Sequence, residues 1–69
     1  MKLIVNGDPH TSSGTADKVT VADLVTELNL TGRRLAVEVN REIVPKSEHG
    51  THILREGDTV EIVHAIGGG

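Results

Sequence analysis

The sequence predicts an α+β fold in which a mixed sheet of about four or five strands packs on one main helix. One segment, beginning near Thr20, has the apolar spacing of an amphipathic helix. Short runs rich in β-branched residues stand before and after it. The first and last of these runs are strongly apolar, so we expect them in the middle of the sheet; if they lie side by side in parallel, the helix belongs to a right-handed crossover. A single helix must bury its apolar face against one side of that sheet.

Composition excludes several classes of protein. The 69 residues make one small domain, and the absence of cysteine excludes disulfides and thiolate chemistry. A net charge of −3 and the lack of aromatic residues argue against a nucleic-acid partner. No apolar run reaches the roughly 18 residues of a membrane helix, and the N-terminal residues do not form a signal peptide. We therefore expect a cytoplasmic protein that is a monomer when free and has no membrane partner.

The N-terminal segment predicts a strand and a turn. Residues 2–6, Lys-Leu-Ile-Val-Asn, contain strong β-formers. Residues 6–9, Asn-Gly-Asp-Pro, favour a turn, which predicts a weak partner strand near residues 10–13. Residues 12–18 are polar and without periodicity, so they are predicted to form a loop.

The helix is predicted from its cap and its apolar stripe. Thr20 is a good N-cap, and Asp23, three positions later, completes a capping box with Asp in place of Glu. The stripe at i, i+3, i+4 and i+7 consists of Val21, Leu24, Val25 and Leu28. Asn29 and Gly32 are the candidate stop signals.

Two strands are predicted after the helix. Residues 35–39 alternate, with Leu35, Val37 and Val39 on one face. Residues 40–42 predict a turn, and residues 43–44 predict a short strand that ends at Pro45, which cannot donate a ladder hydrogen bond.

The C-terminal third is predicted to return to the middle of the sheet. Residues 46–50 are predicted to be a polar loop, and residues 51–54 a single helical turn whose Ile53 and Leu54 cover the core. Residues 56–58, Glu-Gly-Asp, predict a turn. Residues 60–66 then predict a terminal strand.

Three glycines follow the terminal strand. We therefore divide the chain into a folded domain, residues 1–66, and a flexible glycine tail, residues 67–69. Three residues extend at most about 10 Å, which suffices to enter a narrow cleft on another protein. The carboxylate of Gly69 is therefore the candidate reactive group.

Strand alternation also predicts a candidate docking patch on the sheet. Leu3, Val5, Val60 and Ile62 are expected to face the helix. The candidate partner-binding residues Ile4, Val63 and Ala65, together with Glu61, would then face outward. The alternative is that these are scattered exposed apolar residues, which are common on protein surfaces.

The histidines and serines do not predict an active site or a metal site. His49 and His52 have a spacing that would suit one metal on a helical turn, but no third ligand is evident. Nothing in the sequence supplies an oxyanion hole or pocket for Ser12 or Ser13 with a histidine. We expect no metal, no catalytic residue and no enzyme activity.

Three features together resemble a known family. They are the stretch at residues 37–45, Val-Glu-Val-Asn-Arg-Glu-Ile-Val-Pro, the Glu-Gly-Asp turn at residues 56–58, and the final Gly68-Gly69. In this order, and at this length, they resemble the ubiquitin-like sulfur carriers of the ThiS family, which have the β-grasp fold. The resemblance covers nearly the whole chain and departs from it at residues 10–18, which are longer and more polar than is usual there.

The resemblance implies a carrier rather than an enzyme. A ThiF-like activating enzyme would use ATP to adenylate Gly69, and a sulfur donor would convert the adenylate to a thiocarboxylate. Gly68 would be the penultimate glycine of this tail, and Gly67 would add flexibility. A ThiG-like thiazole synthase would then receive the sulfur for the thiazole of thiamine. The chain itself would bind no cofactor.

Other functions remain open from the sequence. One is a molybdopterin-type or other ubiquitin-like sulfur carrier. Another is a protein modifier, in which Gly69 would form an isopeptide bond with a lysine of a target. A third is an interaction domain with an inert tail.

Overall fold

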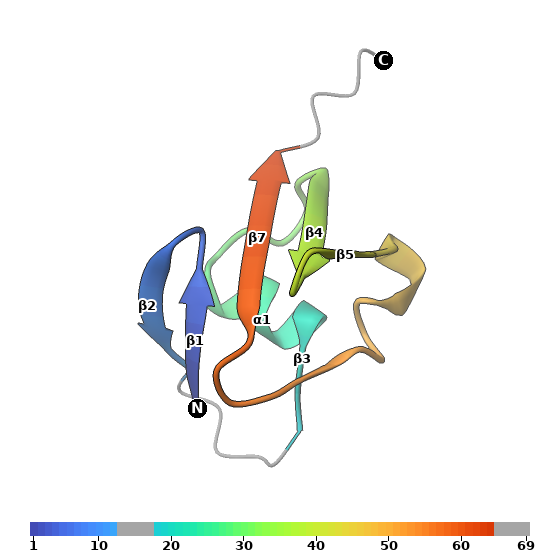
Figure 1. The fold of residues 1–69 in the computed structure, drawn as a ribbon. Helices are drawn as coiled ribbons and strands as arrows, with labels where there is room; N and C mark the ends of the chain where they lie inside the picture. The colour runs from blue at the N-terminus through green and yellow to red at the C-terminus, as the bar shows by residue number, and fades with distance from the viewer. Residues whose placement is uncertain (13–17, 65–69) are drawn as a thin grey trace.

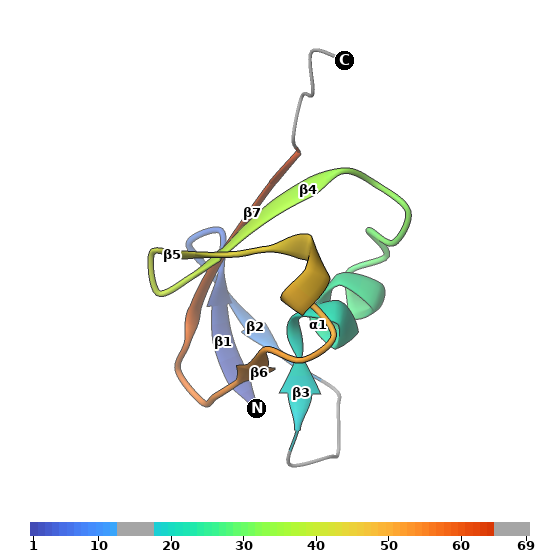
Figure 2. The same cartoon turned by 90° about the vertical axis from the view of Figure 1, so that its right-hand side faces the viewer.

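The computed structural model describes residues 1–12 and 18–64. A five-stranded sheet has the order β2-β1-β7-β4-β5, so the first and last strands lie inside it as predicted, and they are parallel neighbours (Figure 1). Helix α1 lies on one side of this sheet with the small β3–β6 sheet (Figure 2). The elements are β1 (Lys2–Val5), β2 (Asp8–Thr11), β3 (Val19–Thr20), α1 (Val21–Glu27), β4 (Leu35–Val39), β5 (Glu42–Val44), the 3₁₀ helix η1 (Lys46–Glu48), β6 (Ile53–Leu54) and β7 (Thr59–His64). The predicted α+β fold is therefore confirmed.

The first hairpin turns earlier than its sequence indicated. Val5 pairs with Asp8, so only Asn6 and Gly7 form the turn, and both have positive φ, 51° and 85°. This is the backbone of the tight hairpin turns that favour Asn-Gly. The prediction that Asp8 and Pro9 belong to the turn was therefore wrong. The predicted partner strand is confirmed, but it spans Asp8–Thr11 instead of residues 10–13. Pro9 is tolerated because β2 is an edge strand.

The helix has the predicted cap and end. The backbone N–H of Asp23 donates to Thr20 Oγ1 at 3.1 Å, and the N–H of Thr20 donates to Asp23 Oδ2 at 3.0 Å. The capping box is thus complete. The helix ends at Glu27, and Asn29 adopts a positive φ of 64°, which a continuing helix does not allow.

The core lies between α1 and the facing side of the sheet. Its most buried large side chains are Leu3, Val21, Leu24, Val37, Leu54 and Val60. Val25 and Leu28 are half-buried and pack against the edge of this core. The apolar stripe of the helix is therefore confirmed, but its four members are not buried to the same depth.

The segment after Pro45 differs from its prediction. The helical turn is η1, inside residues 46–50, where a loop was expected. The helical turn predicted at residues 51–54 was wrong, because Ile53 and Leu54 form β6 and pair with β3. Leu54 is buried as predicted, but Ile53 is 43% exposed and does not cover the core. Their pairing partner is a strand of only two residues, which was not predicted.

The β4–β5 turn is tied to the start of β7. Asn40 and Arg41 have positive φ, 51° and 71°, and Glu42 belongs to β5 instead of the predicted turn. The Asn40 side chain accepts a hydrogen bond from the N–H of Thr59 and donates one to Asp58, both at 3.0 Å. This side chain therefore fixes where the last strand enters the sheet.

Candidate functional site

Strand β7 leads directly to the predicted tail and is held firmly up to its last described residue. Its pairing with β4 runs from Val60, opposite Val39, to His64, opposite Leu35. On its other side β1 pairs with it only near Thr59 and Val60. The strand begins at Thr59, one residue before the prediction, and its last two predicted residues, with the tail glycines Gly67, Gly68 and Gly69, lie outside the described residues.

Asn6 extends the support of β7 beyond the end of β1. Its backbone N–H donates to the carbonyl of Val60 at 2.9 Å. Its side-chain Oδ1 then accepts a hydrogen bond from the N–H of Ile62 at 2.8 Å. A turn residue thus takes the place of a missing strand residue. Beyond Ile62 only β4 flanks the strand in the described part of the chain.

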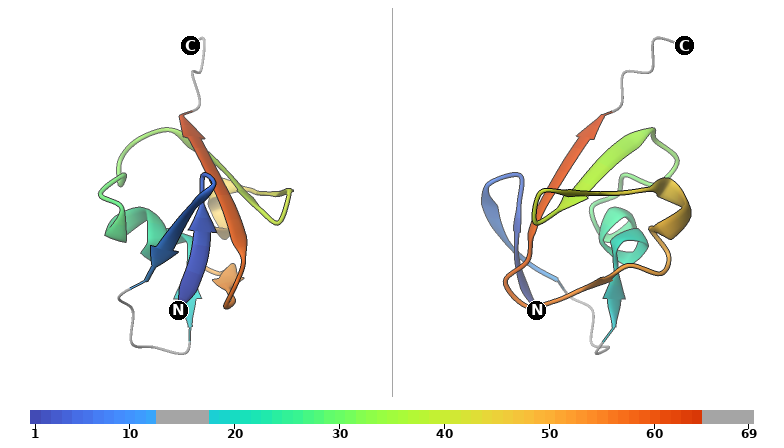
Figure 3. Two further views of the ribbon diagram at one scale, coloured as in Figure 1. Left: turned by 60° about the vertical axis from the view of Figure 1, so that its left-hand side comes forward. Right: turned by 45° about the vertical axis from the view of Figure 1, so that its right-hand side comes forward.

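The predicted facing of the central strands is confirmed. Leu3, Val5, Val60 and Ile62 are buried, and Ile4, Glu61 and Val63 are exposed. Figure 3 shows that α1 covers one face of the sheet, and no described helix covers the other. We call this uncovered side the open face. Ala65, the third predicted docking residue, lies outside the described residues.

The structure does not bring Ile4 and Val63 together. Ile4 lies opposite Thr59, four residues before Val63. At the rise of a β-strand this separates them by about 13 Å along the sheet, with Glu61 between them. The neighbour of Val63 is instead Ala36 of β4, which is also exposed. Val63 and Ala36 form an apolar pair near the end of β7.

Ile43 is an open-face residue that our prediction missed. It is 73% exposed and lies opposite Glu38, which lies opposite Glu61. The alternation of residues 35–39 already placed Glu38 on the opposite face of the sheet from Val37 and Val39. The position of Ile43 depends on the turn, because a turn of only Asn40 and Arg41 sets which residue faces Glu38.

The open face therefore combines apolar side chains with two adjacent carboxylates. Ala36, Ile43 and Val63 surround Glu38 and Glu61 across β4, β5 and β7. Such a surface complements a partner that presents apolar groups and positive charge.

The described residues hold no candidate metal centre. No group of three or more His, Asp or Glu among them could hold a metal ion. His49 uses Nε2 to donate to the carbonyl of Val44 at 3.1 Å, a structural role. No described helix is long and apolar enough to span a bilayer.

This architecture defines a class of protein: a small ubiquitin-like β-grasp domain, with one helix on a five-stranded mixed sheet. Comparison with known proteins gives the family. The ThiS family model matches residues 3–69, and the chain belongs to that family. The resemblance in the sequence is thus confirmed.

A solved structure and a curated relative agree with this assignment. The crystal structure of the thiamine biosynthesis protein ThiS from Geobacter metallireducens has a TM-score of 0.84 and 33% identity, covering 100% of both chains. The sulfur carrier protein ThiS of Bacillus subtilis is 38% identical over 53 residues, which are 77% of this chain and 80% of that protein.

Two longer proteins also match the whole chain. A thiazole synthase of Paramagnetospirillum magneticum is 45% identical over 69 residues, and one of Magnetococcus marinus is 39% identical over 70 residues. The chain spans about a fifth of each, since these matches cover 20% of either protein.

Proposed function

We propose that this chain carries sulfur as a thiocarboxylate at the carboxyl group of Gly69, for the thiazole of thiamine. The observation that carries the proposal is the ThiS family match, which extends through the last glycine. The rigid strand β7 supports it, since β7 is anchored as far as His64 and five residues follow. Those five residues reach at most about 17 Å. The folded domain would thus hold the reacting group at a limited distance from its docking surface.

Activation is needed because a carboxylate is a poor electrophile. The carboxyl group of Gly69 is ionised at neutral pH, since its pKa in a peptide is about 3.3–3.7. Attack on the α-phosphate of ATP forms an acyl-adenylate and releases pyrophosphate. A sulfide-level sulfur nucleophile then attacks the acyl carbon, and AMP leaves. The chain is a co-substrate in this scheme; the ATP is used by the activating enzyme, and the chain itself holds no cofactor.

The open face is the proposed docking surface for the ThiF-like activating enzyme. Apolar contacts close to the end of β7 come from Val63 with Ala36, and from Ile43 beside the glutamates. Ile4 would contact a more distant part of the enzyme, and Ala65 would extend the contact toward the tail. The enzyme surface should carry positive charge opposite Glu38 and Glu61.

A ThiG-like thiazole synthase is the proposed acceptor. The two thiazole synthases that match this chain over its whole length support this choice. A molybdopterin-type carrier or a protein modifier would use the same tail with a different acceptor. The cytoplasmic location and the monomeric state of the free protein stay predictions.

The test is intact mass spectrometry after incubation with a ThiF-like enzyme, ATP, Mg²⁺ and sulfide. We expect one oxygen to be exchanged for sulfur, and fragmentation should localise the change to Gly69. Incubation without ATP is the control. An unchanged mass with an enzyme that activates another carrier would refute the proposal, and adducts on lysines of other proteins would favour a modifier.

A pair of matched variants tests the docking surface. Val63→Asp places a charge in the apolar pair of the open face, and Ile53→Asp places one on the separate β6 strand. Both sites are exposed, at 56% and 43%, so neither change should unfold the chain. We expect Val63→Asp to raise the KM of the activating enzyme for the carrier at least about tenfold, and Ile53→Asp to leave it unchanged. Equal values for the two variants would place the docking surface elsewhere.

A further inference from the structure

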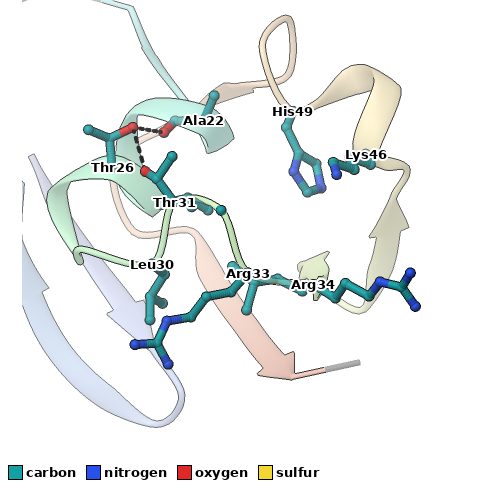
Figure 4. A pocket seen from close by; sticks show the side chains of 11 residues that line it. Ala22, Thr26, Leu30, Thr31, Arg33, Arg34, Lys46 and His49 are labelled. Atoms are coloured by element: carbon teal, nitrogen blue, oxygen red, sulfur yellow. Dashed lines mark hydrogen bonds between the residues drawn. The ribbon is translucent and has the colours of Figure 1, made fainter. Parts of the chain in front are cut away.

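A cationic groove lies on the helix side of the molecule, away from the open face. It has a volume of about 400 Å³ and runs between α1, the segment before β4, and η1. Figure 4 shows the side chains that line it. They are Ala22, Val25, Thr26, Leu30, Thr31, Gly32, Arg33, Arg34, Leu35, Lys46 and His49. Nothing in the proposed sulfur chemistry uses this groove.

The walls of the groove are fixed by hydrogen bonds. The N–H of Ala22 donates to the carbonyl of His49 at 2.8 Å, which ties α1 to the end of η1. The His49 ring donates to the carbonyl of Val44, which holds η1 against β5. At the other end the N–H of Leu30 donates to the carbonyl of Val25 at 3.0 Å. The groove is therefore part of the folded framework.

Its charge is opposite to that of the whole chain. The protein has 10 acidic and 7 Lys and Arg residues, yet Arg33, Arg34 and Lys46 line the groove, and its described lining includes no Asp or Glu. Within residues 1–12 and 18–64 none of these three cations has an ion-pair partner. Unpaired positive charge on an acidic protein favours an acidic ligand.

The apolar floor of the groove and the spacing of its charges indicate which kind of ligand would fit. Val25, Leu30 and Leu35 are half-buried and line the groove with apolar surface. The hydroxyl of Thr31 donates to Thr26, and that of Thr26 donates to the carbonyl of Ala22, so both hydroxyl protons are already used (Figure 4). Small hydrated anions gain little from such a floor.

The arginines also do not converge on one point. The side chains of Arg33 and Arg34 extend in opposite directions, and Lys46 lies across from them beside His49 (Figure 4). Separated charges around an apolar floor fit an extended ligand with carboxylates on both sides of an apolar side chain.

We propose that this groove is a second docking surface, which binds an acidic segment of a partner protein through an apolar side chain flanked by carboxylates. Because α1 lies on the opposite side of the sheet from the open face, such a segment would not compete with a protein docked there. The carrier would thus present two independent surfaces. This inference does not depend on the chemistry of Gly69.

The test is a titration of the isotope-labelled protein by NMR with a short peptide in which glutamates flank one leucine on both sides. A peptide with glutamines in place of the glutamates is the control ligand. We expect shifts confined to the backbone amides of the groove residues with the acidic peptide, and a clear weakening when salt is raised from about 0.05 to about 0.5 M. The glutamine peptide should bind at least about tenfold more weakly.

Two charge-matched variants complete the test. Arg33→Glu with Lys46→Glu reverses charge in the groove and should weaken the acidic peptide at least about tenfold. Lys18→Glu with Arg55→Glu changes the net charge equally at exposed sites that do not line the groove, and should change the affinity less than about twofold. Any of five results would overturn the proposal. Two concern the variants and the site: equal losses of affinity in both variants, or shifts on the open face. The other three are equal binding of the glutamine peptide, the same shifts with inorganic phosphate alone, and no shifts at millimolar peptide.

Discussion

Replacing Leu24 by Ala tests the central contact of the fold, the packing of α1 on the sheet. The side chain is fully buried, at 0% exposure, within a core built from both the helix and the strands. The change removes about three buried carbons at roughly 0.8 kcal/mol each, which gives about 2.4 kcal/mol before any cavity term. With the cavity we expect a loss of about 3–4 kcal/mol. A chain of 69 residues has a total stability of roughly 3.5–10 kcal/mol, so this loss is a large fraction of it.

The assay is urea unfolding followed by far-UV circular dichroism, because the chain has no aromatic residue for fluorescence. With an m-value near 1 kcal/mol/M, the midpoint should fall by about 3–4 M. Leu28→Ala is the matched control: Leu28 is only half-buried, so its loss should cost about 1 kcal/mol. A cost below about 1 kcal/mol for Leu24→Ala, or equal costs for both leucines, would refute the packing described above.

Three further predictions concern the cap, a turn and the open face. Thr20→Ala removes one half of the capping box and should lower the free energy of unfolding by about 1 kcal/mol, whereas Thr20→Ser should keep most of it; urea midpoints that do not separate the two would contradict the role of the cap. Asn40→Ala loses the bond to Thr59 and strains a positive φ, so it should cost about 1–3 kcal/mol; Asn40→Gly should cost less, and calorimetry showing the reverse order would exclude backbone strain as a cause. Glu61→Gln removes the repulsion between Glu61 and Glu38, which lies directly opposite it on β4. The change should stabilise the chain by roughly 0.2–1 kcal/mol, least at high salt. Destabilisation in the same calorimetric measurement would mean that another contact stabilises the two carboxylates.

The helix and the central strands could be predicted because several local signals agreed. The Thr20–Asp23 box fixed the start of α1, Asn29 marked its end, and period-two alternation assigned Leu3, Val5, Val60 and Ile62 to the core. Burial depth along the helix stripe was not predictable, since it depends on which residues face the middle of the sheet.

The errors lie where a tertiary contact outweighs local preference. Asp8 and Pro9 favour turns, yet the turn of Asn6 and Gly7 comes first and leaves them in an edge strand. Ile53 belongs to a strand of two residues, and such a strand forms only because β3 lies beside it.

The candidate site was predicted in part for the same reason. Alternation put Ile4 and Val63 on the open face, but their separation depends on the register between β1 and β7, which no local pattern sets. The position of Ile43 follows from the β4–β5 turn, and Lys46 lines the same groove as Arg33 and Arg34 only because η1 contacts α1.

The parallel pairing of β1 and β7 also has a mechanical consequence. The N-terminal end of β1 and the carboxyl end of β7 lie at opposite ends of this strand pair (Figure 1). Tension between those ends would load the hydrogen bonds between the two segments together in shear, among them Ile4 N to Asp58 O, Asn6 N to Val60 O, and Ile62 N to the Asn6 side chain. Bonds loaded in shear share a force, whereas bonds loaded in sequence break one after another. A force applied to the end of β7 would therefore be resisted by several hydrogen bonds at the same time.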